Sequence, residues 1–108
     1  SAREAAERQS AVDVQDAHFK LLTAQRTLHM YRTELVPQAE ARFSTSEAGY
    51  REGKVDFLDL LESERFLLNT KVMTAMSEGT VGMQAARLER AVGIDMTVIS
   101  PDEHKVNP

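Results

Sequence analysis

The chain contains no cysteine and no tryptophan, and only four phenylalanines and two tyrosines are aromatic among its 108 residues. The absence of cysteine excludes disulfides and thiolate metal sites. No apolar run approaches the ~20 residues that a membrane-spanning helix needs. The net charge of −4 combines both signs, without the basic patch typical of proteins that bind nucleic acid or a membrane surface. The abundant residue types, Ala, Glu, Arg, Leu and Gln, are typical of elongated helices.

The length allows one domain at most. The first eight residues lack the hydrophobic core of a signal peptide and resemble the interior of a helix. We therefore expect the chain to be a segment of a longer protein.

Residues 2–50 are predicted to form one long helix. Small and apolar residues recur there at alternating spacings of three and four, the heptad pattern of a helix that packs against other helices. These positions are Val14, Ala17, Leu21, Ala24, Leu28, Tyr31 and Leu35. Pro37 lacks the amide donor that a helix needs, so we expect a kink near it or a short break around residues 35–38. The pattern should then resume, with Phe43 to one side, at Ala41, Thr45 and Ala48.

Residues 57–92 are predicted to form a second helix after a turn at residues 51–56. Asp56 is placed to act as its N-cap, and Asp59 puts a carboxylate in the first turn, where the helix dipole favours negative charge. Gly53 suits a left-handed turn, and Gly93 is expected to end the second helix, followed by an extended or disordered tail at 94–108. The predicted packing face consists of Leu58, Leu61, Arg65, Leu68, Val72, Ala75, Gly79, Gly82 and Ala86.

The predicted fold is all-α, with residues 1–93 forming a long, coiled-coil-like antiparallel helical hairpin. Two helices cannot cover all of the apolar surface, because the second helix also has apolar residues away from its main packing face. These are Leu60, Leu67, Met73, Met76, Val81 and Leu88. The pattern therefore predicts intermolecular assembly.

Three stretches, residues 31–39, 48–62 and 85–93, carry a resemblance to a known family. The second contains a Tyr-x-x-Gly turn, from Tyr50 to Gly53, followed by several acidic residues. Together the three stretches resemble the TolC family of outer-membrane efflux proteins, and the first is similar to the branch that serves heavy-metal efflux pumps. The resemblance covers nearly all of residues 11–93, which would correspond to the C-terminal of the family's two helical repeats.

The resemblance implies a periplasmic segment of a homotrimeric channel, in the outer membrane of a Gram-negative bacterium, that exports metal ions or small toxic compounds. In that family long helices form an α-barrel across the periplasm, and the membrane is reached only through a β-barrel that this segment lacks. The turn would lie at the periplasmic tip, close to the periplasmic adaptor protein and the inner-membrane pump. By position, the tip and gating residues would be Tyr50, Gly53, Asp56, Asp59 and Glu62.

Simpler roles remain open for several of these residues. In one alternative, Asp56 and Asp59 serve as helix-capping residues and have no role in a channel. Tyr50 can pack its ring against Phe57 or Leu58 without any part in gating.

The chain also departs from the best-known member of the family, which has a basic residue at the position of Val55 and an aspartate at that of Glu62. No nucleophile with a base, no phosphate-binding loop and no metal cluster is evident, so neither an enzyme nor a cofactor is predicted. Met73 and Met76 are expected to be packing residues. The alternative function is a stand-alone structural coiled coil or adaptor hairpin that mediates protein–protein assembly.

Overall fold

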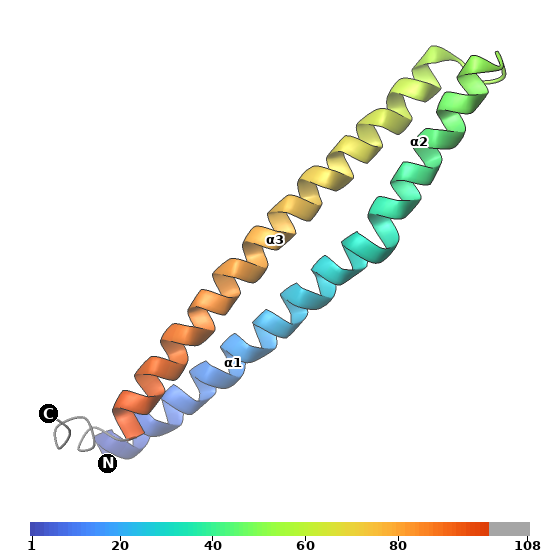
Figure 1. The fold of residues 1–108 in the computed structure, drawn as a ribbon. Coiled ribbons are helices and arrows are strands. Elements are labelled where there is room, and N and C mark those ends of the chain that lie inside the picture. Colours follow the sequence, from blue (N-terminus) through green and yellow to red (C-terminus); the bar gives the residue numbers. More distant parts are fainter. Residues whose placement is uncertain (100–108) are drawn as a thin grey trace, which may run out of the picture. The chain divides into compact units, whose positions relative to one another are not determined.

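The computed structural model describes residues 1–99, and all of its regular elements are helices (Figure 1). The first arm consists of α1 (Ala2–Met30), the π-helical turn η1 (Tyr31–Leu35) and α2 (Val36–Arg51), which follow one another without a break. One turn joins this arm to α3 (Phe57–Ile99). The predicted all-α antiparallel helical hairpin is confirmed.

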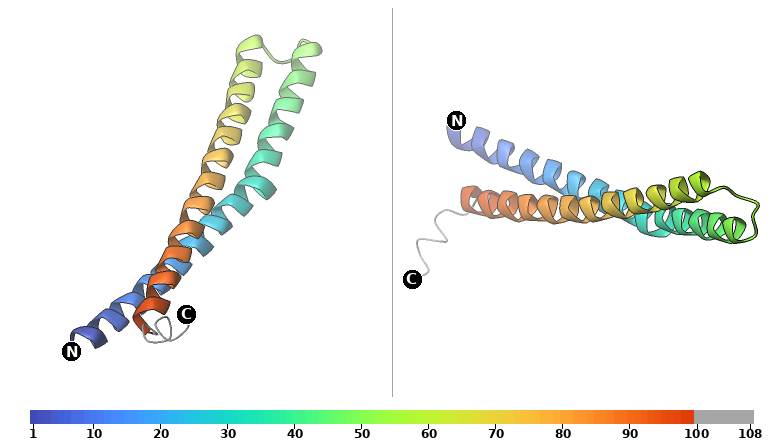
Figure 2. Two further views of the ribbon diagram at one scale, coloured as in Figure 1. Left: turned by 60° about the vertical axis from the view of Figure 1, so that its left-hand side comes forward. Right: turned by 90° about the horizontal axis from the view of Figure 1, so that it is seen from above.

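The described residues form two units. Arg26–Gly79 contains the end of α1, η1, α2, the turn and the first part of α3. Within this unit α2 runs antiparallel to α3, as Figures 1 and 2 both show. The other unit combines Ser1–Gln25, which contains most of α1, with residues 80–99 of α3.

Pro37 is accommodated by the π-helical turn that precedes it, and the break predicted as one alternative at residues 35–38 does not occur. The backbone N–H of Val36 donates to the carbonyl of Tyr31, five residues back. In a regular helix the proline ring would crowd the carbonyl four residues before it, and proline has no N–H to donate. A wider turn just ahead of Pro37 therefore lets the helix continue.

The packing face of the first arm follows the prediction only up to this turn. All seven predicted positions before Pro37 are buried or half-buried. Past it the prediction is wrong, because the π turn holds an extra residue and shifts the register of everything that follows. Ala39 is wholly buried and Phe43 half-buried. The positions predicted instead, Ala41, Thr45 and Ala48, are exposed.

The buried face of α3 also differs from the predicted one. Small hydroxyl side chains line it in the Arg26–Gly79 unit, together with Leu67. These residues are Ser63, Thr70, Thr74 and Ser77. Leu58, Leu68 and Val72, which belong to the predicted packing face, are exposed. The sequence pattern located a real apolar stripe, but that stripe lies on the outer side of α3.

Hydroxyl groups can be buried in α3 because they bond to the backbone of the same helix. Ser63 Oγ donates to the Leu60 carbonyl at 2.7 Å, and Thr74 Oγ1 donates to the Thr70 carbonyl at 2.7 Å. Thr70 Oγ1 donates likewise to the Phe66 carbonyl at 2.8 Å. A buried hydroxyl with such a partner escapes the desolvation cost of an unpaired polar group. Small hydroxyl residues can therefore lie on the buried side of α3 without an unpaired polar group.

The second helix is longer than predicted. Gly93 does not end it, since α3 continues to Ile99. Gly53 is the only residue with positive φ among those described, so Gly93 has no left-handed conformation that would stop a helix. Thr97 Oγ1 donates to the Gly93 carbonyl at 2.9 Å within the continuing helix. The rest of the predicted tail, residues 100–108, lies outside the described residues.

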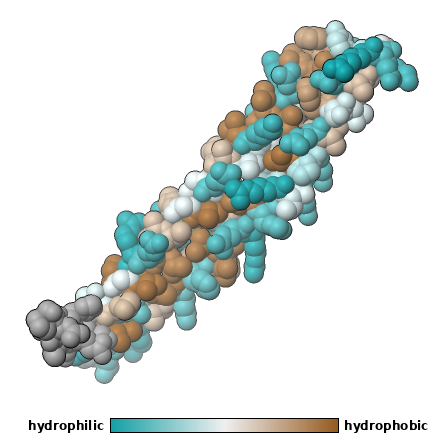
Figure 3. Space-filling view, in the orientation of Figure 1, coloured by the Kyte–Doolittle hydropathy of each residue, from teal (hydrophilic) through white to brown (hydrophobic). Residues whose placement is uncertain are grey.

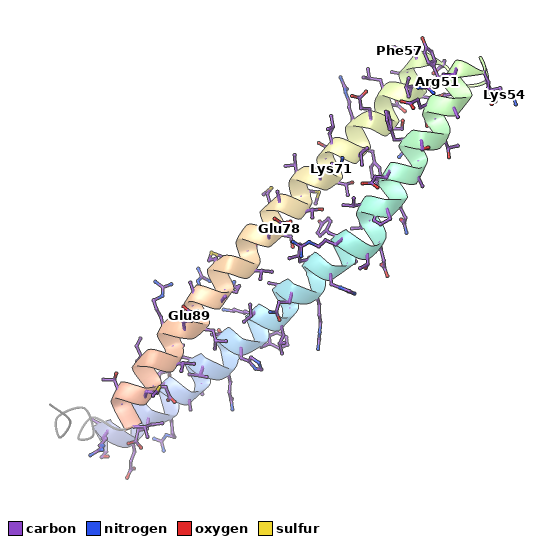
Figure 4. The ribbon with its side chains drawn as sticks, viewed as in Figure 1. Arg51, Lys54, Phe57, Lys71, Glu78 and Glu89 are labelled. Atoms are coloured by element: carbon purple, nitrogen blue, oxygen red, sulfur yellow. The ribbon has the colours of Figure 1, made fainter. Side chains whose placement is uncertain are left out.

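Away from the turn, an ion pair and a cation–π contact join the arms within the Arg26–Gly79 unit. Arg32 Nη2 lies 3.0 Å from Glu78 Oε1, and Figure 4 shows Glu78 on α3. The guanidinium carbon of Arg42 lies 5.1 Å from the centre of the Phe66 ring, within the range of a cation–π contact. Both contacts involve partly exposed side chains, so they align the arms more than they stabilise them.

Large apolar side chains are mostly on the outside of this fold. Figure 3 shows hydrophobic atoms reaching the surface among the polar ones. Met73 and Met76 are 51% and 68% exposed, whereas the buried apolar residues are mainly alanines. Burial of an apolar side chain is worth roughly 1.5–3 kcal/mol, so this surface favours contact with further helices.

Candidate functional site

The end of α2 forms the first half of the candidate site, the turn at residues 50–62. Gly53 adopts φ +75°, which other residues rarely tolerate, and the chain reverses there. The Lys54 N–H donates to the Gly49 carbonyl at 2.8 Å, and the Gly53 N–H to the Tyr50 carbonyl at 3.0 Å. This pair of bonds is the Schellman arrangement, which satisfies carbonyls that have no partner at the end of a helix. The predicted role of Gly53 as the turn glycine is thus matched by its geometry.

Val55 and Gly49 hold the turn against the end of α2. A Cβ atom at position 49 would lie 2.5 Å from Val55 Cγ2 and 3.3 Å from Val55 Cβ. The Val55 N–H also donates to the Gly49 carbonyl at 3.2 Å. Sequence analysis missed this pair, although a glycine inside a predicted helix next to a turn was a signal of close approach.

Asp56 begins α3 as predicted. Its Oδ1 accepts the Asp59 backbone N–H at 2.9 Å, which is the N-cap hydrogen bond to the third helical residue. The Asp56 carbonyl accepts the Leu60 N–H at 3.2 Å and starts the helical ladder. The geometry of Asp56 is therefore explained by helix initiation alone.

Three exposed carboxylates follow one another along the first turns of α3: Asp56, Asp59 and Glu62. Among residues 1–99 none of the three has an ion-pair partner. Two basic residues of the turn are paired with other acids, Arg51 with Glu47 and Lys54 with Glu52, both at 3.3 Å.

The carboxylates repel one another. Repulsion by Asp56 is the largest cause that raises the pKa of Asp59 above its ordinary value, followed by partial desolvation, a hydrogen bond between the Asp56 and Asp59 side chains, and repulsion by Glu62. A raised pKa in an exposed acid means that surrounding negative charge outweighs the favourable helix dipole. The turn is thus a concentrated negative surface.

Tyr50 packs against the start of α3, which is one of the two alternatives anticipated for it. The rings of Tyr50 and Phe57 are 6.0 Å apart between centres and meet edge to face at 61°. Figure 4 shows Phe57 at the turn end of the hairpin with Arg51 and Lys54. Both rings keep a large exposed area, 43% for Tyr50 and 60% for Phe57. All five predicted tip residues therefore lie at one end of the Arg26–Gly79 unit, with an aromatic surface beside the acidic one.

The geometry offers neither a metal site nor a membrane span in the described part of the chain. Within residues 1–99, no group of three or more His, Asp or Glu side chains is placed to hold a metal ion. No helix there combines the length and apolar character needed to cross a membrane.

Comparison with known proteins identifies a family. The model of the family described as outer membrane efflux protein matches residues 1–94. No curated protein and no solved structure gives a significant match. The family model spans most of the chain, including both arms and the acidic turn between them. The chain therefore belongs to the outer membrane efflux protein family.

Proposed function

We propose that this chain is the periplasmic helical segment of a trimeric outer-membrane channel in a tripartite efflux pump. Membership of the efflux family supports the channel, and the exposed apolar side chains of α3 support assembly with further helices. In this proposal the turn at residues 50–62 is the end of the channel that meets the periplasmic adaptor protein and the inner-membrane pump.

The observation that carries the proposal is the unpaired acidic turn. Three copies of Asp56, Asp59 and Glu62 around one axis would form rings of negative charge, and acidic rings attract cations and exclude anions. Within one copy, repulsion by Asp56 raises the pKa of Asp59, so these carboxylates already lie close enough to interact. A cation-selective entrance fits export of metal ions or of small cationic toxic compounds, in line with the heavy-metal branch that the sequence resembles.

The experiment is charge reversal in the full-length channel reconstituted in planar bilayers. We expect the double variant Asp59→Lys/Glu62→Lys to lose cation preference, seen as a shift of the reversal potential in a salt gradient. Glu89→Lys is the matched control, since Glu89 is an exposed carboxylate later in α3 and outside the Arg26–Gly79 unit (Figure 4). Unchanged selectivity in the double variant would refute the acidic-ring role.

The substrate class needs a separate experiment. A strain without the full-length protein should become sensitive to transition-metal salts, and the intact gene should restore growth. Sensitivity confined to small organic toxicants would exclude the metal-exporting form of the proposal and leave the channel itself in place.

A further inference from the structure

The backbone of the first arm is weakened at η1. The Val36 N–H bonds to the Tyr31 carbonyl, and Pro37 has no N–H to donate. The carbonyls of Arg32 and Thr33 therefore lack the donors that a regular α-helix would supply. Sharp bends in helices occur mostly at proline, at pairs of glycine and serine, and at π-helical turns. η1 and the proline that follows it combine two of these features in one place.

The backbone of α3 is weakened at Gly79 and Gly82. Both glycines are exposed, and a Cβ atom at either would meet nothing within 4 Å among the described residues. Neither has a positive φ, so neither a close neighbour in the chain nor a left-handed conformation explains them. Each costs roughly 1 kcal/mol relative to alanine in the interior of a helix. Their remaining effect on α3 is a backbone with fewer steric restrictions.

An ion pair shows that these two weak points lie side by side. Arg32 belongs to η1, and its Nη2 is 3.0 Å from Oε1 of Glu78, which directly precedes Gly79 in α3 (Figure 4). The two side chains are 57% and 50% exposed, so the pair adds little to the stability of the fold. Its position is more informative than its strength, because it joins the arms where both backbones are weakened.

We propose that η1 and residues 79–82 form a paired hinge, at which both arms bend together, and that the Arg32–Glu78 ion pair limits the bending. Two packed antiparallel arms do not bend independently, because a bend in one arm alone would pull it away from the other. The segment that carries the turn at residues 50–62 then moves as one body, and its own packing is unchanged. Hinges of this kind absorb a displacement in a few backbone torsions.

A paired hinge differs in one respect from two unrelated local features. If η1 only accommodates Pro37, and the glycines only soften α3, a change in one arm has no effect on the backbone of the other. In a paired hinge the change is transmitted. The deciding measurement is therefore made in the first arm after a substitution in α3.

The first test is amide hydrogen exchange of the 108-residue chain, followed residue by residue by NMR. Gly79→Ala should slow exchange at residues 79–84 about five-fold, because alanine favours the helix. The Val36 amide of the first arm should slow as well. Gly93→Ala is the matched control, since Gly93 also has open space around it in α3, and it should leave the Val36 amide unchanged. If Gly79→Ala does not affect Val36, or if both variants affect it equally, the paired hinge is wrong.

The second test reverses one charge of the ion pair. Arg32→Glu brings two like charges together and should speed exchange about three-fold, both at Val36 and at residues 79–84. The exchange of charges in Arg32→Glu/Glu78→Arg should restore the rates of the parent chain in both arms. Faster exchange at Val36 alone, or no recovery in the double variant, would contradict the role of the ion pair.

The control for the second test is Lys20→Glu. Lys20 pairs with Asp16 of the same helix at 2.9 Å, so this ion pair does not join the arms. Its reversal should leave the exchange rates at Val36 and at residues 79–84 unchanged, and an effect equal to that of Arg32→Glu would count against the hinge. Neither test involves the channel, so a negative result leaves the proposed function standing.

Discussion

Val55 Cγ2 lies 2.5 Å from the point where any side chain at Gly49 would place its Cβ atom. Val55 can therefore pack against the end of α2 only because position 49 has no side chain. Valine is stiff about its first side-chain torsion and has little freedom to move aside. The close approach sets how tightly the turn folds back onto the helix.

Gly49→Ala should destabilise the hairpin, although alanine is the better helix former. The gain in helix propensity is about 1 kcal/mol, whereas overpacking costs about 1–3 kcal/mol. We expect a net loss of about 1 kcal/mol in urea unfolding. In a Val55→Ala background the same substitution should stabilise the chain. Gly93→Ala is the control, because a Cβ there meets nothing, and equal gains at positions 49 and 93 would contradict the prediction.

Gly53→Ala should also destabilise the turn, through backbone conformation and not through packing. No atom lies within 4 Å of a Cβ at this position, but φ is +75°. A left-handed conformation costs a residue other than glycine roughly 1–2 kcal/mol. Gly53→Asn should lose less, since asparagine tolerates this region better. Thermal unfolding followed by circular dichroism measures both, and an alanine variant as stable as the parent would disprove the assignment.

Removal of the N-cap should weaken the start of α3. Asp56→Ala is expected to cost about 0.5–2 kcal/mol of unfolding free energy, because the Asp59 N–H loses its acceptor. Asp56→Ser keeps an acceptor and should retain most of the stability. Hydrogen exchange of the Asp59 amide should accelerate in the alanine variant alone. Equal exchange in both variants would show that the cap is not what protects this amide.

The pKa of Asp59, followed by NMR of its carboxyl carbon, should lie above the ordinary aspartate value. Asp56→Asn should lower that pKa towards the ordinary value. Glu62→Gln should lower it less, because repulsion by Glu62 is a smaller cause of the raised pKa than repulsion by Asp56. The folded chain holds the Asp59 proton more tightly than the unfolded chain does. Asp59 therefore favours folding at pH values below the pKa that it has in the unfolded chain. That contribution is lost as pH rises through the folded pKa. A pKa unaffected by Asp56→Asn would contradict the repulsion.

The hairpin and both ends of its turn could be predicted from the sequence, because those features depend on local interactions. Gly53 and Asp56 act through bonds to residues a few positions away, and such interactions are visible in a short window of sequence. Val55 was missed because its packing on Gly49 depends on how the chain folds back, which spacing alone does not specify.

The spacing of apolar residues did not predict which faces of the two arms are buried. The π turn before Pro37 adds a residue that no heptad count anticipates, so the face predicted beyond it was wrong. In α3 the spacing of three and four selected the exposed side, because the buried side is lined by serine and threonine. Hydrophobicity was a poor guide there, since those hydroxyls are satisfied by their own helix.

The same hydroxyls have a mechanical consequence. Ser63, Thr70 and Thr74 bond to carbonyls of α3 and not to the first arm. Within the Arg26–Gly79 unit the arms can slide or part without breaking any of these three hydrogen bonds, and the losses fall on packing contacts, the Arg42–Phe66 contact and the Arg32–Glu78 ion pair. These three hydrogen bonds therefore add nothing to the resistance of the arms to displacement along this stretch.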